Sequence, residues 1–327
     1  MLTRRQLMLH SAGLATLSLA TGPAAAQAPT WPSQAVRLVV TFPPGGSSDL
    51  VARLIGPLLS ERLGQPVIVE NRPGAGSTIG AAFVAGGDAS GHTLLMSNSS
   101  PMSISPALMD KPTYDPIKSF RHLVYIGDVP TVLVVHPSLG ITDFAGFLAW
   151  ARSQKDPIAF GSGGAASVGH IVGEMLAQKA GLKLSHIPYR GAGPMRSDLL
   201  GGQIKVAVDA LPQNLQFQKS GQLRLLAVSS ARRVAQAPDI PTFEELGQSG
   251  LVAENFVGIS GPAGMPAPAS QAIVQAMAQL LAQADVRAKL QGMGFELENK
   301  SPEAFTAFVK QQAEQWLPVV KSSGATL

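Results

Sequence analysis

The sequence contains no cysteine among its 327 residues, which excludes disulfides, thiolate metal ligands and cysteine nucleophiles. Charged residues are also scarce, at 14%. The formal net charge of +4 includes Arg4 and Arg5, the only charged side chains of the first 26 residues; without them 23 Lys+Arg face 21 Asp+Glu, a net charge of +2. So small an excess, with no clustered basic stripe, argues against nucleic acid as the main partner.

Catalytic and nucleotide-binding motifs are missing as well. The chain has no G-x-x-x-x-G-K-[ST], no G-x-S-x-G, no S-x-x-K and no H-E-x-x-H. The histidines beyond the first 26 residues are isolated from one another, so no local metal cluster is expected, and His170 and His186 are interpreted as structural. These absences predict a protein that is not an enzyme and that needs neither metal nor cofactor.

Long apolar runs are absent after the N-terminus, so no membrane insertion is expected beyond it. Residues 1–26 have the features of an export signal. Arg4-Arg5 is the twin arginine of a Tat-type signal, a short apolar stretch follows, and Ala24-Ala25-Ala26 fits the small-x-small cleavage rule. An ordinary Sec signal with two chance arginines is the alternative. Either interpretation predicts a mature chain that starts near Gln27 and a periplasmic location.

The remaining sequence alternates short β-rich runs with helical runs, a pattern that predicts parallel sheets with helices on both faces. The length suits two such α/β domains. The expected strands are 36–41, 67–70, 93–97, 132–136, 158–160, 184–188, 204–208, 223–228 and 256–260. The expected helices are 49–63, 79–85, 143–153 with Thr142 as N-cap, 170–179, 195–200, 215–220, 269–293 and 302–321.

Two loops between a strand and a helix are candidates for anion binding. The first runs from Phe42 to Asp49 and contains Gly45-Gly46, which let a ligand approach the backbone. The second runs from Gly161 to Ser167 and has the same small residues and hydroxyls. Helix N-termini favour anions, so the pair could hold the two ends of a dicarboxylate. The alternative for the first loop is a tight turn with Ser48 or Asp49 as N-cap.

A third glycine-rich loop, Asn71–Ser77, does not fit a dinucleotide site. Its glycines fall at Gly74, Gly76 and Gly80, one residue too long for G-x-G-x-x-G. Pro73 also removes an amide where a pyrophosphate would need one.

The ordered motifs of the chain resemble the Bug-type receptors, the extracytoplasmic solute-binding proteins of tripartite tricarboxylate transporters. The resemblance covers nearly the whole sequence after the signal. It rests on Trp31-Pro32, Val39–Ser47, Gly64–Val67, Glu70–Gly76, Gly91–Met96, Val134–Ser138, His186–Gly191, Asp198–Gln203, Leu226–Ser229, Pro238–Thr242 and Gly261–Gly264.

The resemblance implies a type II periplasmic-binding-protein fold, with two α/β domains around a ligand cleft joined by two crossing strands near 129–137 and 254–260. Domain 1 would comprise 27–136 plus 255–327, and domain 2 would comprise 137–254. It also implies a small carboxylate as ligand, the membrane subunits of a tripartite transporter as partners, and a monomer. The candidate ligand-binding residues are Phe42, Pro44, Gly45, Gly46, Ser47, Asp49, Ser97, Asn98, Ser162, Gly163, Gly164, Ala165, Ser167, Tyr189 and Asp209.

The chain departs from the family pattern on the side of domain 2. An asparagine of the family loop is replaced by Ala165, a hydroxyl is lost at Val168, and a common Asp-Asn pair is Asp209-Ala210. A frequent tryptophan is Phe256. We therefore expect a ligand with one strongly bound carboxylate and a less polar or aromatic tail rather than citrate. Two other functions stay open: a periplasmic sensor that presents its closed form to a membrane signalling protein, and an exported hydrolase.

Overall fold

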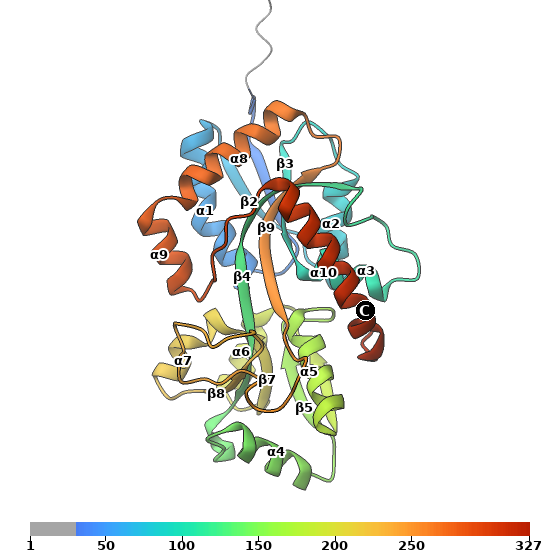
Figure 1. Ribbon diagram of the computed structural model, residues 1–327, viewed down its shortest axis with the longest axis vertical. Helices are drawn as coiled ribbons and strands as arrows, with labels where there is room; N and C mark the ends of the chain where they lie inside the picture. The colour runs from blue at the N-terminus through green and yellow to red at the C-terminus, as the bar shows by residue number, and fades with distance from the viewer. Residues whose placement is uncertain (1–30) are drawn as a thin grey trace, which may run out of the picture.

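The structure, a computed structural model, describes residues 31–327, so the predicted export signal lies outside the described residues. Two α/β lobes lie one above the other, and two strands run between them (Figure 1). Lobe 1 contains β1 (Val36–Val40), β2 (Val67–Asn71), β3 (Thr93–Asn98), most of β4 (Phe120–Val135) and β9 (Glu254–Pro262). Lobe 2 contains β5 (Ile158–Ser162), β6 (Leu184–Pro188), β7 (Val206–Ala210) and β8 (Arg224–Val228).

The sheets are mixed rather than purely parallel, and the strands that join the lobes are the reason. In lobe 1 the order is β2-β1-β3-β9-β4, with β1 parallel to β2 and β3 but β9 antiparallel to both of its neighbours. In lobe 2, β5 is parallel to β6 and β7, whereas β4 is antiparallel to β7 and β8. A strand that returns directly from the other lobe has no helical crossover, so it pairs antiparallel.

Strand β4 serves both lobes along its length. Residues 120–130 pair with β9 in lobe 1, and residues 131–135 pair with β7 in lobe 2. It begins twelve residues before the strand predicted at 132–136, because the register shifts after His122 and Tyr125 break the period of two that a sequence pattern needs. The predicted domain bound at 254/255 falls at the start of β9, whereas the bound at 136/137 follows a part of β4 that already pairs within lobe 2. Both bounds stay predictions.

The helices cover the two sheets. Lobe 1 carries α1 (Ser47–Leu63), α2 (Thr78–Ala85), α3 (Ser105–Leu108), α8 (Ala267–Leu281), α9 (Ala284–Gly292) and α10 (Pro302–Ser322). Lobe 2 carries α4 (Phe144–Ser153), α5 (Val168–Ala180), α6 (Ala192–Leu200) and α7 (Leu215–Lys219). Short 3₁₀ or π turns lie at Ala75–Ser77, Ser100–Ile104, Pro137–Leu139 and Leu211–Gln213.

Two helix predictions were wrong in detail. The long helix expected over 269–293 is two helices, since α8 ends at Leu281 and α9 begins at Ala284. The N-cap of α4 is Asp143 and not Thr142, because the Asp143 side chain accepts a hydrogen bond of 2.7 Å from the backbone N–H of Gly146.

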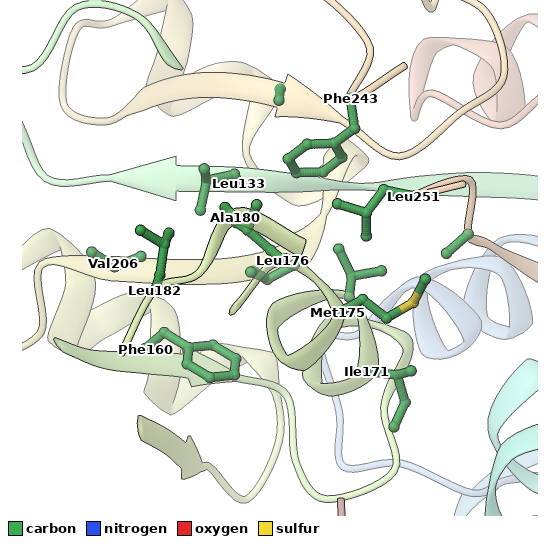
Figure 2. Close-up of a cluster of buried hydrophobic side chains, with 14 of the residues drawn as sticks. Leu133, Phe160, Ile171, Met175, Leu176, Ala180, Leu182, Val206, Phe243 and Leu251 are labelled. Carbon is green, nitrogen blue, oxygen red and sulfur yellow. The ribbon is translucent and has the colours of Figure 1, made fainter. Parts of the chain in front are cut away.

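Each lobe has its own apolar core. In lobe 1 the buried faces of α1 and α8 pack against β1 and β3. In lobe 2 the core gathers Phe160, Leu176, Val206 and Phe243 around α5 (Figure 2). The C-terminal part of α10 also joins the lobe 2 core through buried Trp316. The lobes therefore touch at α10 as well as along β4 and β9.

Candidate functional site

A cavity of about 80 Å³ lies between the lobes and is walled by both of them. Its floor and walls come from the loops after β1, β5 and β6, from β7, and from the crossing strands. The lining residues are Phe42, Pro43, Gly46, Ser47, Ser48, Ser100, Thr131, Gly163, Ser167, Val168, Gly169, Gly191, Ala192, Val208, Asp209, Ala210, Gln213 and Asn255. The position outside the carboxyl ends of strands is where ligands bind in open α/β sheets.

Three helices begin at this cavity: α1 at Ser47, α5 at Val168 and α6 at Ala192. The first backbone N–H groups of a helix have no partner within the helix, and the helix dipole makes this end partly positive. The N-caps of α1 and α6 are Gly46 and Gly191, and neither provides a side-chain cap. Apart from the N–H of Ser47, which donates to Gln213, their terminal donors have no side-chain cap and are available to a ligand. The sequence predicted two helix N-termini here, and the structure adds α6.

The cavity has an anion-binding backbone but no cationic side chain. Among the described residues that line it, Asp209 is the only one with an ionisable side chain. The remaining polar groups are hydroxyls and amides, which are neutral donors and acceptors. An anion in this cavity would be held by backbone and side-chain dipoles rather than by a salt bridge.

The loop of lobe 1 is held from behind by a buried carboxylate. Asp49 is 2% exposed, and its Oδ2 accepts 2.9 Å from the backbone N–H of Gly45 and 3.0 Å from Nε of Arg53. Its Oδ1 accepts from Nδ2 of Asn71 at 2.9 Å. Burial alone would raise the pKa of Asp49, but these hydrogen bonds outweigh it and hold the pKa below the ordinary value. Asp49 fixes the loop and does not line the cavity.

The loop of lobe 2 is held by neutral groups. Ser162 Oγ lies 2.7 Å from Nε2 of His186 and accepts from Ser167 Oγ at 3.1 Å. The His186 ring stacks on His170, with centroids 3.7 Å apart, and Nδ1 of His170 accepts from the backbone N–H of Ala166. Burial lowers the pKa of His170 to about 4 and that of His186 to about 3. Both rings are therefore uncharged at neutral pH, as an acceptor role for His170 requires.

Contacts across the cavity show that the two lobes are closed on each other. With the Gln213 amide of lobe 2 turned so that both of its ends find partners, its oxygen accepts from the backbone N–H of Ser47 in lobe 1 at 2.8 Å. A Cβ atom on Gly191 would lie 3.0 Å from Cβ of Pro43, so the two loops are in van der Waals contact. Asn255 lies at the start of the crossing strand β9, and its side chain donates to Ser47 Oγ at 3.4 Å.

Asp209 stands at the end of β7 with its side chain in the lobe 2 wall. It is 6% exposed, and its Oδ2 accepts from Nδ2 of Asn214 at 2.9 Å. Arg196 Nη1 lies 3.8 Å from the same oxygen. Burial raises the pKa of Asp209, while Arg196 and Asn214 act in the opposite direction.

The predicted site residues separate into two groups. Phe42, Gly46, Ser47, Gly163, Ser167 and Asp209 line the cavity, whereas Pro44, Gly45, Asp49, Ser97, Asn98, Ser162, Gly164, Ala165 and Tyr189 do not. Several of the second group have partners elsewhere: Ser97 Oγ accepts from Ser260, and the Tyr189 hydroxyl donates to Asp198 Oδ2 at 2.8 Å. Contact with a ligand stays a prediction for all fifteen.

Sequence reasoning missed several lining residues that come from distant parts of the chain. Thr131, Gln213 and Asn255 reach the cavity only because the crossing strands and the turn after β7 meet there. No local signal marks them. Gly191 did have a signal, since it is a glycine between a strand and a helix, like the two loops that were predicted.

No group of three or more His, Asp or Glu side chains within residues 31–327 is arranged to hold a metal ion. Over the same residues, none of the helices has both the length and the apolar character that crossing a membrane requires.

Sequence comparison identifies the family. A family model described as "Tripartite tricarboxylate transporter family receptor" matches residues 51–325. The chain belongs to this receptor family. Protein BugT of Bordetella pertussis is 33% identical over 301 residues, which cover 92% of each chain.

Solved structures of similar receptors share the fold. An R. palustris protein solved with adipate is 30% identical, with a TM-score of 0.86 over 90% of this chain and 99% of that chain. MatC from Rhodopseudomonas palustris, solved with bound malate, is 28% identical, with a TM-score of 0.83 over 89% and 100% of the two chains. The type II binding-protein fold predicted from the sequence is confirmed.

In this member of the receptor family, four apolar side chains stand on the lobe 2 side of the cavity. They are Val168, Val208, Ala192 and Ala210. The same side carries the polar Ser167, Asp209 and Gln213, and lobe 1 contributes the hydroxyls of Ser47 and Ser48 as well as the apolar Phe42 and Pro43. Both lobes therefore combine polar and apolar lining.

Proposed function

We propose that this protein is a periplasmic receptor that captures a small carboxylate and presents it to the membrane subunits of a tripartite tricarboxylate transporter. The convergence of three helix N-termini on a cavity with no cationic side chain carries the proposal. Each helix N-terminus is equivalent to roughly half a positive charge, which suits a carboxylate that must be bound and released again. The carboxylates in the adipate- and malate-bound relatives support this ligand class.

The ligand would stabilise the closed arrangement, because the three helix N-termini come from both lobes. In an open arrangement a carboxylate at α1 would lose the donors of α5 and α6. A ligand that binds the closed form more tightly shifts the population toward it, and the transporter then recognises a surface present only when the lobes are shut. One chain lines the whole cavity, so capture needs no second copy, and we propose that the receptor acts as a monomer.

A binding role is better supported than a catalytic one. Ser162 and His186 are in hydrogen-bond contact, as a nucleophile and its base would be, but Ser162 is fully buried and does not line the cavity. Its hydroxyl is engaged in holding the loop, so it is not placed to attack a ligand.

The test is a thermal-shift and calorimetric screen of the refolded chain without its first 26 residues against mono-, di- and tricarboxylates, amines and sugars. A carboxylate at 100 times its Kd should add about 2.7 kcal/mol of stability. Gly46→Val should abolish that shift, because Gly46 lines the cavity and an added Cβ points into open space there. Gly292→Val, a helix glycine of α9 with equally open surroundings, is the matched control.

A shift with neutral or cationic compounds and none with carboxylates would refute the carboxylate assignment. The choice between a transporter and a signalling protein as partner needs a second experiment. The purified closed receptor should be captured by membranes that contain the two transporter subunits in a ligand-dependent way. Capture by a signalling protein under the same conditions would support the sensor.

A further inference from the structure

The carboxylate of Asp209 has one oxygen that side chains of the protein hold and one that they do not. Oδ2 accepts from Asn214 and lies close to Arg196. Within residues 31–327 no side chain donates a hydrogen bond to Oδ1, and the backbone N–H of Ala210 is the remaining donor to this carboxylate, although the residue is 94% buried and lines the cavity. A carboxylate has about four lone-pair sites, so Oδ1 can accept a further hydrogen bond from water or a ligand.

The surrounding wall offers no donor side chain to this oxygen. Val208 and Ala210 flank Asp209 on β7, and Val168 and Ala192 begin the two helices that face it. All four side chains are apolar. Thr131, which pairs with Ala210 on the neighbouring strand, already has its hydroxyl 2.7 Å from Ser229 Oγ. A further donor to Oδ1 would therefore come from what fills the cavity.

A negatively charged group of a ligand would be disfavoured beside the Asp209 carboxylate. In a closed cavity the effective dielectric is low, so two carboxylates in contact repel more strongly than they do in water. The positive Arg196 does not line the cavity and is already paired with Oδ2, so it does not neutralise a second carboxylate. The anionic end of a ligand belongs at the helix N-termini, away from Asp209.

We propose that the ligand is a small monocarboxylate that carries a hydroxyl, amine or amide N–H group, and that this group donates a hydrogen bond to Oδ1 of Asp209. The inference rests on the proposed function, since it assumes the carboxylate at the helix N-termini. It makes Asp209 the residue that selects a hydroxy- or amino-acid over a dicarboxylate of the same length. The small volume of the closed cavity favours a short, unbranched ligand.

The test compares matched ligands on the wild-type protein by calorimetry. Hydroxy- and amino-substituted carboxylates of three to six carbons are measured against the unsubstituted acids and the dicarboxylates of equal length. We expect the best donor-bearing acid to bind at least about tenfold more tightly than either counterpart, the usual size of a hydrogen bond to a charged group. Wild-type protein that binds dicarboxylates as tightly as hydroxy- and amino-acids would overturn the inference.

Asp209→Asn sharpens the test, because the amide keeps the shape of the side chain and can donate to an anion. It should lose the preference for the donor-bearing acid and gain affinity for the dicarboxylate. Asp239→Asn removes the same charge from an exposed position in lobe 2 and should leave the ranking unchanged. An Asp209→Asn protein that folds and keeps the wild-type ranking would also refute the role of Asp209.

The outcomes separate this inference from the proposed function. Binding of dicarboxylates without discrimination sinks the role of Asp209 but leaves a carboxylate receptor. The absence of any carboxylate binding sinks the receptor proposal itself, and the inference falls with it.

Discussion

The two loops that face each other across the cavity do the same task with opposite chemistry. In lobe 1 the charged Asp49 holds the loop, helped by Arg53, whose side chain is 51% exposed. In lobe 2 the uncharged Ser162, His186 and His170 hold it from within. Both arrangements leave helix N–H groups free for an anion. The side chains behind the two loops therefore determine how each loop responds to acid and to mutation.

The first prediction concerns the contact between the two loops. Gly191→Leu should weaken ligand binding on the order of 100-fold, because a side chain there collides with Pro43 of lobe 1 when the lobes close. Gly191 also has a positive φ of 102°, so local strain is expected as well. Calorimetry measures the binding loss.

Gly221→Leu is the control for that strain. Gly221 has a φ of 71° with no atom within 4 Å of its added Cβ, and it lies outside the cavity. It should lower the Tm without changing Kd. Equal binding losses in both variants would show that strain, and not the Pro43 contact, is responsible.

The second prediction concerns the charged half of the comparison. Asp49→Ala should lower the free energy of unfolding by about 2 kcal/mol, since it removes hydrogen bonds to a buried carboxylate. Arg53→Ala should change it by less than about 1 kcal/mol, because the Arg53 side chain is half exposed and Asp49 keeps its hydrogen bonds from Gly45 and Asn71. Urea unfolding measures both. A loss for Arg53→Ala as large as that for Asp49→Ala would mean that the ion pair, and not the backbone contact, holds the loop.

The same contrast explains what could be predicted from sequence. The loops Phe42–Asp49 and Gly161–Ser167 were recognisable because glycines and hydroxyls between a strand and a helix have a local signature. Six of the fifteen predicted residues line the cavity for that reason. The side chains that hold the loops have no such signature. Asp49 and Ser162 look like ligand residues in sequence but do not line the cavity. Besides local partners, each bonds to a residue of another strand, Asn71 for Asp49 and His186 for Ser162.

Residues brought in by topology escaped prediction for a related reason. Gln213 and Asn255 reach Ser47 from sequence distances of 166 and 208 residues, through the turn after β7 and the start of β9. Neither segment has a pattern that separates it from an ordinary loop. Val168 and Ala210 could be predicted, because the sequence departs from the resembled family pattern at both positions. Both line the cavity.

The third prediction concerns how low pH changes the stability of the lobe 2 loop, which uncharged side chains hold. The folded-state pKa values of His170 and His186, about 4 and about 3, lie below the unfolded value of 6.5. Below pH 6.5 the unfolded chain binds more protons, so stability is full above that pH and falls as the pH drops toward 4. Each ring contributes up to about 1.4 kcal/mol per pH unit. Asp49 stays ionised over this range because its pKa is lowered below 3.8.

His186→Gln is the variant that checks this assignment, because an amide can still bond to Ser162 but does not titrate. Its Tm should fall less steeply between pH 6.5 and 4 than that of the wild type. His136→Gln, at a half-buried position of lobe 2 away from this loop, should follow the wild-type curve. Parallel curves for all three proteins would place the acid sensitivity elsewhere.

The smallest expected effect concerns the hydrogen bond between Gln213 of lobe 2 and Ser47 of lobe 1. Gln213→Ala removes the hydrogen bond to the Ser47 backbone across the cavity, and a neutral bond of this kind contributes about 1 kcal/mol. Ligand affinity should fall about fivefold, and small-angle scattering should show a larger radius of gyration before ligand is added. Asn255→Ala is the matched amide change. Asn255 accepts from the backbone N–H of Ser99, which follows β3 in lobe 1, and has only a long contact to Ser47, so its loss should not favour opening. If both variants open alike, the closed arrangement is set by the crossing strands, and the contact between the loops contributes nothing to it.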